Sequence, residues 1–380
     1  MTMAELSHDL RSIDPRMAVV PVNRDGLAWH LPFETPMRLF GFPWFDQDHA
    51  YDRLPLARPA EVTQFPNGVK TMVSGKDCVA YLLSCKVAGG QVRFRTDSAR
   101  FAVEAEEFDN HHYDNITATG SMGMDLYLKE DDRWVCLGVT RRNPAEAAFS
   151  AEIAKGIRRE MHDVILHLPS CSGIRRLFIG LEETAHVEPP TPFAAPEPVV
   201  WYGTSIVQGV GATRPGLLAS NLLSRLLNRE VLNQGYAGGG KGEPEIAEML
   251  AAIPNPALYL IDYAWNVGLR ELQATLPGLL DTLRRRHPAV PLLLVSPTPG
   301  ADALKAVLGK TFDLEGETKY LRETCQARRD AGDRRIFFFD AFHEGLGEDF
   351  WEGLVDGVHL NDLGNYRLAN AILPVVKALL

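Results

Sequence analysis

Val199-Val200-Trp201-Tyr202-Gly203-Thr204-Ser205-Ile206 is the stretch that decides the fold of the second half of the chain. Its apolar run predicts a strand, and the residues after Ser205 have the pattern of a helix. A serine at such a turn lies beside the free N–H groups of a helix N-terminus, which favour a developing oxyanion. The plainer interpretation is that Ser205 only caps the helix, and this stretch alone leaves both open.

Three more apolar runs follow in the same half, and helical periods lie between them. The runs are 258–263, 291–296 and 335–340. The apolar stripes of the helices lie within 218–226, 269–283 and 366–380, with Pro277 and Pro374 as weak points of the last two. Nearly continuous apolar strands that alternate with helices predict a doubly wound α/β domain with a parallel sheet. Sites in such sheets form at the carboxyl ends of strands, where Ser205, Asn266 and Ser296 fall.

The first half shows many short segments with period-two alternation or hairpin-like spacing, separated by polar turns. These segments are 69–73, 79–83, 91–95, 102–106, 124–128, 134–139, 163–168 and 176–181. Short strands at this spacing predict an all-β sandwich. Between the halves, residues 182–198 contain five prolines, which favour an extended linker over a helix. We therefore predict a β-sandwich domain at 1–182, a linker at 183–198 and a catalytic α/β domain at 199–380.

Composition narrows the functional classes. A net charge of −10 with no basic cluster argues against nucleic acid as a partner. No apolar stretch approaches the roughly 20 residues of a membrane span, so no membrane association is expected. The first residues lack the apolar region of a secretory signal, which predicts a cytoplasmic protein. The five cysteines and the histidines at 111, 112, 162 and 167 match no metal motif, so we expect reduced thiols and no bound metal or cofactor.

Asp356-Gly357-Val358-His359 lies just before the last predicted helix and supplies the groups that a serine nucleophile needs. His359 is the candidate base for the Ser205 proton, and Asp356 is the candidate acceptor for the other ring nitrogen. A surface loop with a helix cap is the plainer alternative for this motif. The glycines of 233–240 expose backbone N–H groups, and the Asn266 amide is a candidate oxyanion donor, although an Asx turn explains Asn266 equally well.

These four segments, in this order and at this spacing, resemble the four blocks of the SGNH, or GDSL-type, hydrolase family over roughly 199–380. The resemblance implies a three-layer, flavodoxin-like catalytic domain with Ser205, His359 and Asp356 as the triad. It also implies an oxyanion hole formed by Ser205, Gly238 and Asn266. The first block departs from the family name, because Thr204 replaces the aspartate of Gly-Asp-Ser-Leu, and Gly239 replaces a frequent Asp or Asn.

Gly123-Met124-Asp125-Leu126-Tyr127 is similar to the Gly-x-Asp-Leu-Tyr signature of a β-sandwich domain found before some SGNH domains. Gln208 and the segment 214–216 also resemble that two-domain subgroup. The resemblance implies a jelly-roll-like sandwich ahead of the catalytic domain.

The expected chemistry is acyl transfer through an acyl-Ser205. We favour an acyltransferase that moves an acyl group from acyl-CoA, as co-substrate, to a hydroxyl of a small molecule or natural product. The alternatives are a carboxylesterase or carbohydrate deacetylase and, from another class, a glycan-binding protein on an inactive SGNH scaffold. Four aromatic residues crowd the motifs, either as an acyl pocket or as core: Tyr202, Trp265, Phe350 and Trp351. The acyl group, the acceptor and the oligomeric state stay open.

Overall fold

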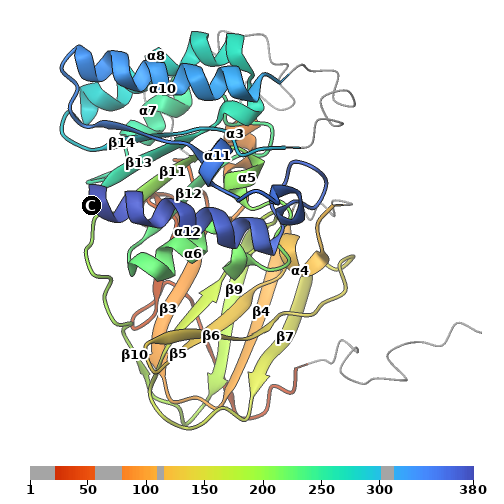
Figure 1. The fold of residues 1–380 in the computed structure, drawn as a ribbon. Helices are drawn as coiled ribbons and strands as arrows, with labels where there is room; N and C mark the ends of the chain where they lie inside the picture. Colours follow the sequence, from red (N-terminus) through yellow and green to blue (C-terminus); the bar gives the residue numbers. More distant parts are fainter. Residues whose placement is uncertain (1–21, 56–78, 109–114, 301–311) are drawn as a thin grey trace, which may run out of the picture.

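The computed structural model describes residues 22–55, 79–108, 115–300 and 312–380. Two antiparallel sheets form the lower half of the molecule in Figure 1, and a parallel sheet between helices forms the upper half. This arrangement confirms the prediction of a β-sandwich followed by a doubly wound α/β domain.

The sandwich packs a four-stranded sheet, in the order β1-β9-β4-β7, against a sheet with the path β10-β3-β8-β5-β6 and β2 beside β3. Apolar side chains from both sheets, such as Phe94, Phe101 and Leu166, form the buried core between them. The strands are β1 (Leu27–His30), β2 (Arg38–Phe40), β3 (Gln91–Thr96), β4 (Arg100–Phe108), β5 (Asp125–Glu130), β6 (Arg133–Val139), β7 (Ala148–Lys155), β8 (His162–His167), β9 (Gly173–Glu182) and β10 (Val187–Glu188). The short helical elements are α2 (Phe45–Asp48), α3 (Val79–Leu82), η3 (Leu83–Cys85) and α4 (Ala118–Ser121).

One predicted strand is wrong. Residues 79–83 form α3 and the start of η3, and Ala80 packs into the core of the α/β domain. A short apolar run cannot be distinguished from a buried helical turn by its periodicity, which explains the error. The predicted strand at 69–73 lies outside the described residues.

The α/β domain has five parallel strands in the order β12-β11-β13-β14-β15. Helices α7, α8 and α10 cover one face, and α5, α6, α11 and α12 cover the other. The strands are β11 (Val199–Gly203), β12 (Val231–Gly235), β13 (Leu258–Asp262), β14 (Leu292–Val295) and β15 (Ile336–Phe339). The helical elements are α5 (Ser205–Gln208), η4 (Pro215–Leu217), α6 (Ala219–Leu227), α7 (Pro244–Ala251), η5 (Ala264–Asn266), α8 (Leu269–Arg286), α10 (Leu314–Asp330), α11 (Ala341–Glu344), η6 (Phe350–Gly353) and α12 (Asp362–Leu379).

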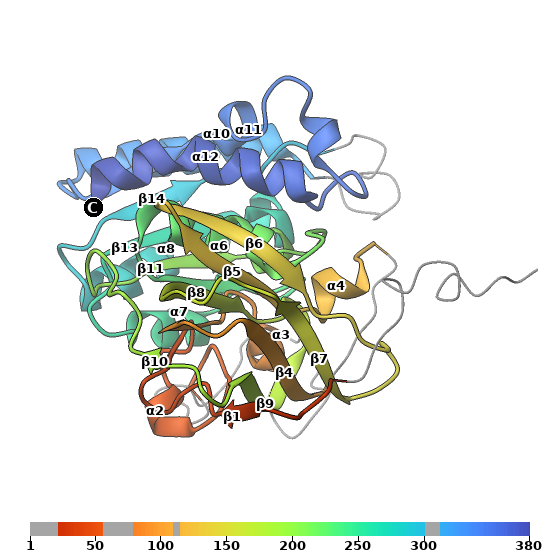
Figure 2. The ribbon, with the colours of Figure 1, turned by 90° about the horizontal axis from the view of Figure 1, so that it is seen from below.

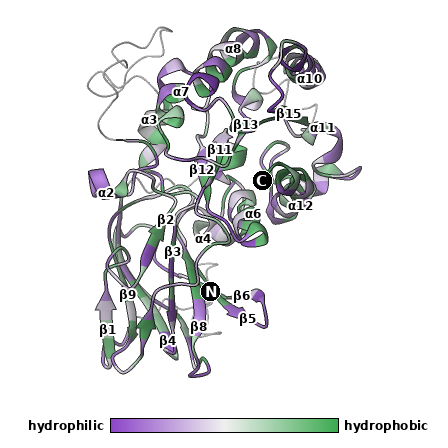
Figure 3. Ribbon diagram, turned by 90° about the vertical axis from the view of Figure 1, so that its left-hand side faces the viewer, coloured by the Kyte–Doolittle hydropathy of each residue, from purple (hydrophilic) through white to green (hydrophobic). Residues whose placement is uncertain are grey.

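The outer helices are amphipathic, as the mixed hydrophobic and hydrophilic colouring of α7 and α8 in Figure 3 shows. Both α8 and α12 continue through their internal prolines, Pro277 and Pro374. A buried stripe that includes Leu272, Leu279 and Leu283 holds α8 on the sheet. Burial of an apolar face therefore outweighs the hydrogen bond that each proline removes.

The two halves share side-chain contacts. Figure 2 shows β5 and β8 in front of α6, and Arg225 of α6 lies 2.8 Å from His167 of β8. Trp44, Leu54 and Ala80 from the first half are buried in the core of the α/β domain. Within the predicted linker, β10 pairs with β3, so the second sheet continues beyond residue 182. The domain limits at 182 and 198 stay predictions.

Candidate active site

Ser205 is the first residue of α5, just after the carboxyl end of strand β11. The helix cap is Thr204, because its side-chain oxygen accepts a hydrogen bond from the N–H of Ile206 at 3.2 Å. The capping role that the sequence left open for Ser205 thus falls to its neighbour. The Ser205 hydroxyl instead faces His359.

Three side chains line up at this turn. His359 Nε2 lies 2.9 Å from Ser205 Oγ, and His359 Nδ1 lies 2.6 Å from Asp356 Oδ2. His359 and Asp356 are separated by only three positions, and the turn between them has Gly357 in the left-handed region at φ +91°. The backbone N–H groups of Val358 and His359 donate to Asp356 Oδ1 at 3.1 and 2.8 Å. The sequence predicted this set of residues, and the structure brings them within hydrogen-bonding distance.

The Asp356 carboxylate is held in its ionised form. Burial opposes ionisation and raises its pKa, but the side chain, backbone N–H and charge of His359, with the side chain of Asn115, outweigh burial. The net result is a pKa of Asp356 well below its usual range. Asp356 is therefore an acceptor for His359 Nδ1–H across the ordinary pH range.

The glycine turn after β12 lies beside the serine. The structure exposes Gly238, whose φ of +67° favours glycine. Gly240 packs so closely that an added Cβ would lie 2.2 Å from the carbonyl oxygen of Gly203. The turn is thus pressed against the end of β11, next to the nucleophile helix.

Asn266 ends η5, just beyond β13. Its Nδ2 donates to the carbonyl oxygens of Tyr236 at 3.2 Å and Gly240 at 3.0 Å. The side chain therefore ties the glycine turn after β12 to the end of β13, on the other side of β11. Its predicted direct contact with an oxyanion stays a prediction.

Two further polar side chains, Arg53 and Gln208, form hydrogen bonds to the backbone where β12 leads into the glycine turn. Arg53 is fully buried, donates to the carbonyl oxygens of Asn233 and Gly235 at 3.1 and 2.7 Å, and lies over the Tyr236 ring. Gln208 accepts from the N–H of Ala237 at 2.9 Å and donates to the Ser170 carbonyl at 3.1 Å. Nothing in the local sequence marks Arg53, because these two partners lie 180 and 182 positions away.

The four candidate pocket aromatics have different surroundings. Tyr202 is only 1% exposed, and its hydroxyl donates to Glu243 and accepts from the N–H of Gly242. Of the two interpretations that the sequence left open for Tyr202, the structure supports core packing, because alternate residues of a strand face opposite sides and Tyr202 points into the α7/α8 core. Trp265 packs on Phe312 and donates to the Thr298 carbonyl at 3.0 Å. Trp351 is 58% exposed and stacks edge-on against Phe350.

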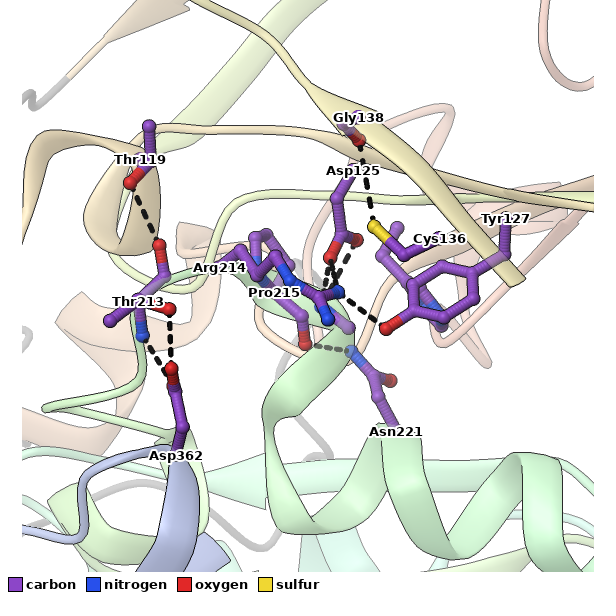
Figure 4. A network of polar contacts seen from close by, with 12 residues as sticks. Thr119, Asp125, Tyr127, Cys136, Gly138, Thr213, Arg214, Pro215, Asn221 and Asp362 are labelled. Carbon is purple, nitrogen blue, oxygen red and sulfur yellow. Dashed lines mark hydrogen bonds and ion pairs between the residues drawn. The ribbon is translucent and has the colours of Figure 1, made fainter. Parts of the chain in front are cut away.

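The Gly-x-Asp-Leu-Tyr segment lies at the contact between the two halves. The buried Asp125 carboxylate accepts from Arg214 at 2.7 Å and from the N–H of Gly216, and Tyr127 contacts Arg214 through its hydroxyl (Figure 4). Burial raises the pKa of Asp125, although the charge of Arg214 opposes this. These contacts fix the loop between α5 and η4, which follows the Ser205 turn.

The remaining predicted residues lie elsewhere. Ser296 accepts from the N–H of Phe342 and so positions α11. His167 contacts Arg225, His162 contacts the Arg158 carbonyl, and residues 111 and 112 are outside the described chain. Cys85, Cys136, Cys171 and Cys325 are free thiols, and Cys78 is not among the described residues. Within the described ranges there is no cluster of three or more potential metal ligands.

No helix in the part of the chain that the structure describes is long and apolar enough to cross a membrane. Curated protein sequences show no match to this chain. The model of the GDSL-like lipase/acylhydrolase family matches residues 196–377. The model of the GxDLY domain, the N-terminus of SGNH-hydrolase-type esterases, matches residues 27–187.

Solved structures share the fold over most of the chain. A GDSL-like lipase from Bacteroides ovatus is 26% identical with a TM-score of 0.80, over 93% of this chain and 98% of that one. The salicylyl-acyltransferase SsfX3 from a tetracycline biosynthetic pathway is 19% identical with a TM-score of 0.67, over the same shares. A family two carbohydrate esterase from Clostridium thermocellum is 13% identical with a TM-score of 0.51, over 77% of this chain and 92% of that one. The chain thus combines a GxDLY-type domain at 27–187 with a domain of the GDSL-like lipase/acylhydrolase family of SGNH serine enzymes at 196–377.

Proposed function

We propose that this enzyme transfers an acyl group through an ester formed on Ser205 Oγ. The observation that carries the proposal is the hydrogen-bonded series Ser205, His359 and Asp356 at 2.9 and 2.6 Å. His359 Nε2 takes the hydroxyl proton as Ser205 attacks the acyl carbonyl, and Asp356 orients the ring through Nδ1–H.

The tetrahedral intermediate needs donors for its oxyanion. We assign the backbone N–H groups of Ser205 and Gly238 to this role, with the Asn266 amide as the third donor. The N–H of Ser205 points from the first turn of α5, where the helix dipole also favours negative charge. Because Asn266 already donates to two carbonyl oxygens, its contribution requires that it share or exchange one of these bonds.

For the full reaction we propose acyl-CoA as donor and a hydroxyl of a small molecule, such as a natural product, as acceptor. His359 returns the serine proton to the departing thiolate, which leaves acyl-Ser205 and free CoA. The acceptor hydroxyl then gives its proton to His359 and takes the acyl group, and Ser205 recovers its proton. The half-buried rings of Trp265 and Phe350 lie on segments beside the motifs and support an apolar acyl site that limits water.

Hydrolysis is the second candidate. Water replaces the acceptor hydroxyl in the same second step, and the enzyme is then an esterase or a carbohydrate deacetylase. The Bacteroides ovatus protein of the same two-domain architecture, which is described as a lipase, favours this outcome. The fold itself also occurs in an acyltransferase and in carbohydrate esterases, so it selects neither.

The deciding experiment is incubation with a panel of acyl-CoA donors, with and without polyhydroxylated acceptors, followed by mass spectrometry of the products. Transfer predicts an acceptor-dependent rise in CoA release together with an acylated acceptor. Free acid as the sole product with every acceptor would contradict transfer and support hydrolysis. A Ser205→Ala variant controls for background reaction of the thioester.

A further inference from the structure

Asn115, which belongs to the first half of the chain, contacts two of the candidate catalytic residues. Asn115 Nδ2 donates to Asp356 Oδ2 at 2.7 Å, across 241 positions of sequence. The same nitrogen lies 3.4 Å from His359 Nδ1. Asn115 therefore contacts the pair on the side where the imidazole and the carboxylate meet.

With this contact, both oxygens of Asp356 are fully used. Oδ1 accepts two backbone N–H groups, and Oδ2 accepts from Asn115 and faces His359 Nδ1. A carboxylate with donors on both oxygens is restrained against rotation about its Cβ–Cγ bond. Asn115 supplies the only one of these donors that does not belong to the 356–359 turn itself.

The segment that carries Asn115 is firmly docked. Ile116 is buried against Cys171 and Val210, and Thr117 caps α4 by accepting from the N–H of Gly120. An added Cβ on Gly120 would lie 2.0 Å from the Ala212 carbonyl oxygen, so α4 sits directly on the loop that follows α5.

Hydrogen bonds extend this docking to the last helix. Thr117 and Thr119 donate to the Thr213 carbonyl at 3.2 and 2.8 Å, and Thr213 in turn donates to Asp362 at the start of α12 (Figure 4). The 356–359 turn immediately precedes α12. The β-domain segment and the catalytic turn are thus fixed to the same neighbours, which pre-organises the Asn115 contact.

We propose that Asn115 is a positioning residue of the acyl-transfer site, which holds Asp356 Oδ2 in place for His359 and makes the β-domain part of the catalytic apparatus. The inference rests on the proposed function, because it concerns the same triad. Its chemistry requires an N–H donor at this place. An aspartate at position 115 has nearly the same shape, but its carboxylate would place a second negative charge against Asp356 Oδ2.

Two variants separate this role from simple packing. Asn115→Ala removes the donor, and Asn115→Asp keeps the shape but replaces the donor with an acceptor. The matched control is Asn143→Ala, an exposed asparagine of the β-domain whose amide contacts Glu146. The readouts are the rate of labelling by a fluorophosphonate, kcat and KM for p-nitrophenyl acetate, and the melting temperature.

We expect Asn115→Ala to lower kcat and the labelling rate about tenfold to a hundredfold, with KM and melting temperature nearly unchanged. Asn115→Asp should be slower still, and Asn143→Ala should match the wild type. Wild-type rates in both Asn115 variants, a faster Asn115→Asp than Asn115→Ala, or a loss of rate that parallels a fall in melting temperature would each overturn the proposal.

The same assay separates the two levels of inference. If the wild type is not labelled at all, the serine mechanism itself fails, and the role of Asn115 fails with it. If the wild type is labelled, Ser205→Ala is not, and both Asn115 variants react normally, only the positioning role is wrong.

Discussion

Thr204 and Ser205, at the start of α5, have different roles. Thr204 satisfies the helix terminus, and Ser205 is left to face His359. The sequence singled out Ser205, His359 and Asp356, which the structure brings together, because serine, histidine and aspartate occur there in recognisable local patterns. It did not predict Asn115 or Arg53, because their contacts with Asp356 and Asn233 span 241 and 180 positions and leave no local signal.

Asp356 is the residue whose removal tests the ordering of the imidazole. We expect Asp356→Asn to lower kcat about a thousandfold or more, because the amide no longer accepts the Nδ1 proton and favours the wrong tautomer. The exposed Asp132→Asn serves as a control of the same chemistry. The measurement is kcat for p-nitrophenyl acetate, and a loss below about tenfold would contradict the assigned role.

The pH dependence of Asp356 has a definite sign. Because its folded-state pKa lies below its usual value, its ionised form and the stability that this form contributes are present above the ordinary pKa of about 3.9. Both are lost only as pH falls through the lower folded-state value. Loss of activity between pH 5 and 7 is therefore not expected to arise from Asp356.

At the scale of elements, period-two alternation predicted the longer strands of the sandwich, and apolar runs predicted the parallel sheet. The prediction failed at 79–83, where a short apolar run forms α3 on the neighbouring core. The sequence left the place of Tyr202 open, because it shows that β11 is buried on both faces but not which layer each side chain enters. Such choices depend on tertiary packing.

Helix α10 carries a group that makes stability depend on pH. Glu317 is buried, and neither carboxylate oxygen has a hydrogen-bond partner among the described residues. Burial, with a smaller effect of Asp313, raises the pKa of Glu317 to about 8. Between about pH 4.3 and 8 the folded chain keeps a proton that the unfolded chain has lost, so stability falls as pH rises.

Glu317→Gln should remove this slope. We expect the free energy of unfolding of the wild type to fall by about 2–4 kcal/mol more than that of the variant between pH 5 and pH 8. Urea denaturation at both pH values measures it, with Glu315→Gln, an exposed residue of the same helix, as control. Equal slopes for wild type and Glu317→Gln would show that Glu317 titrates normally.

At the scale of the whole molecule, the two halves act as one structure around the site. The GxDLY signature supplies Asp125 to the loop after α5, Arg53 supports the glycine turn, and Asn115 reaches Asp356. Sequence patterns predicted both domain folds, but they describe each half separately. Many contacts between the halves join residues that are far apart in the sequence, and no periodicity reveals such contacts.

The Asp125 contact is expected to hold the halves together. Asp125→Ala leaves the Arg214 guanidinium and the Gly216 N–H without their acceptor and should lower the free energy of unfolding by about 3–5 kcal/mol. Glu130→Ala, at the exposed end of the same strand, is the control. Urea denaturation followed by circular dichroism measures the change, and a loss under about 1 kcal/mol would show that the contact is dispensable.

The role of Ser205 as nucleophile is tested most directly by intact-protein mass spectrometry after reaction with a fluorophosphonate, with peptide mapping of the adduct. We expect one covalent adduct, located on Ser205, in the wild type and none in Ser205→Ala, while His359→Ala reacts at least about a thousandfold more slowly. An unlabelled wild type, or an adduct that persists in Ser205→Ala, would contradict catalysis through Ser205.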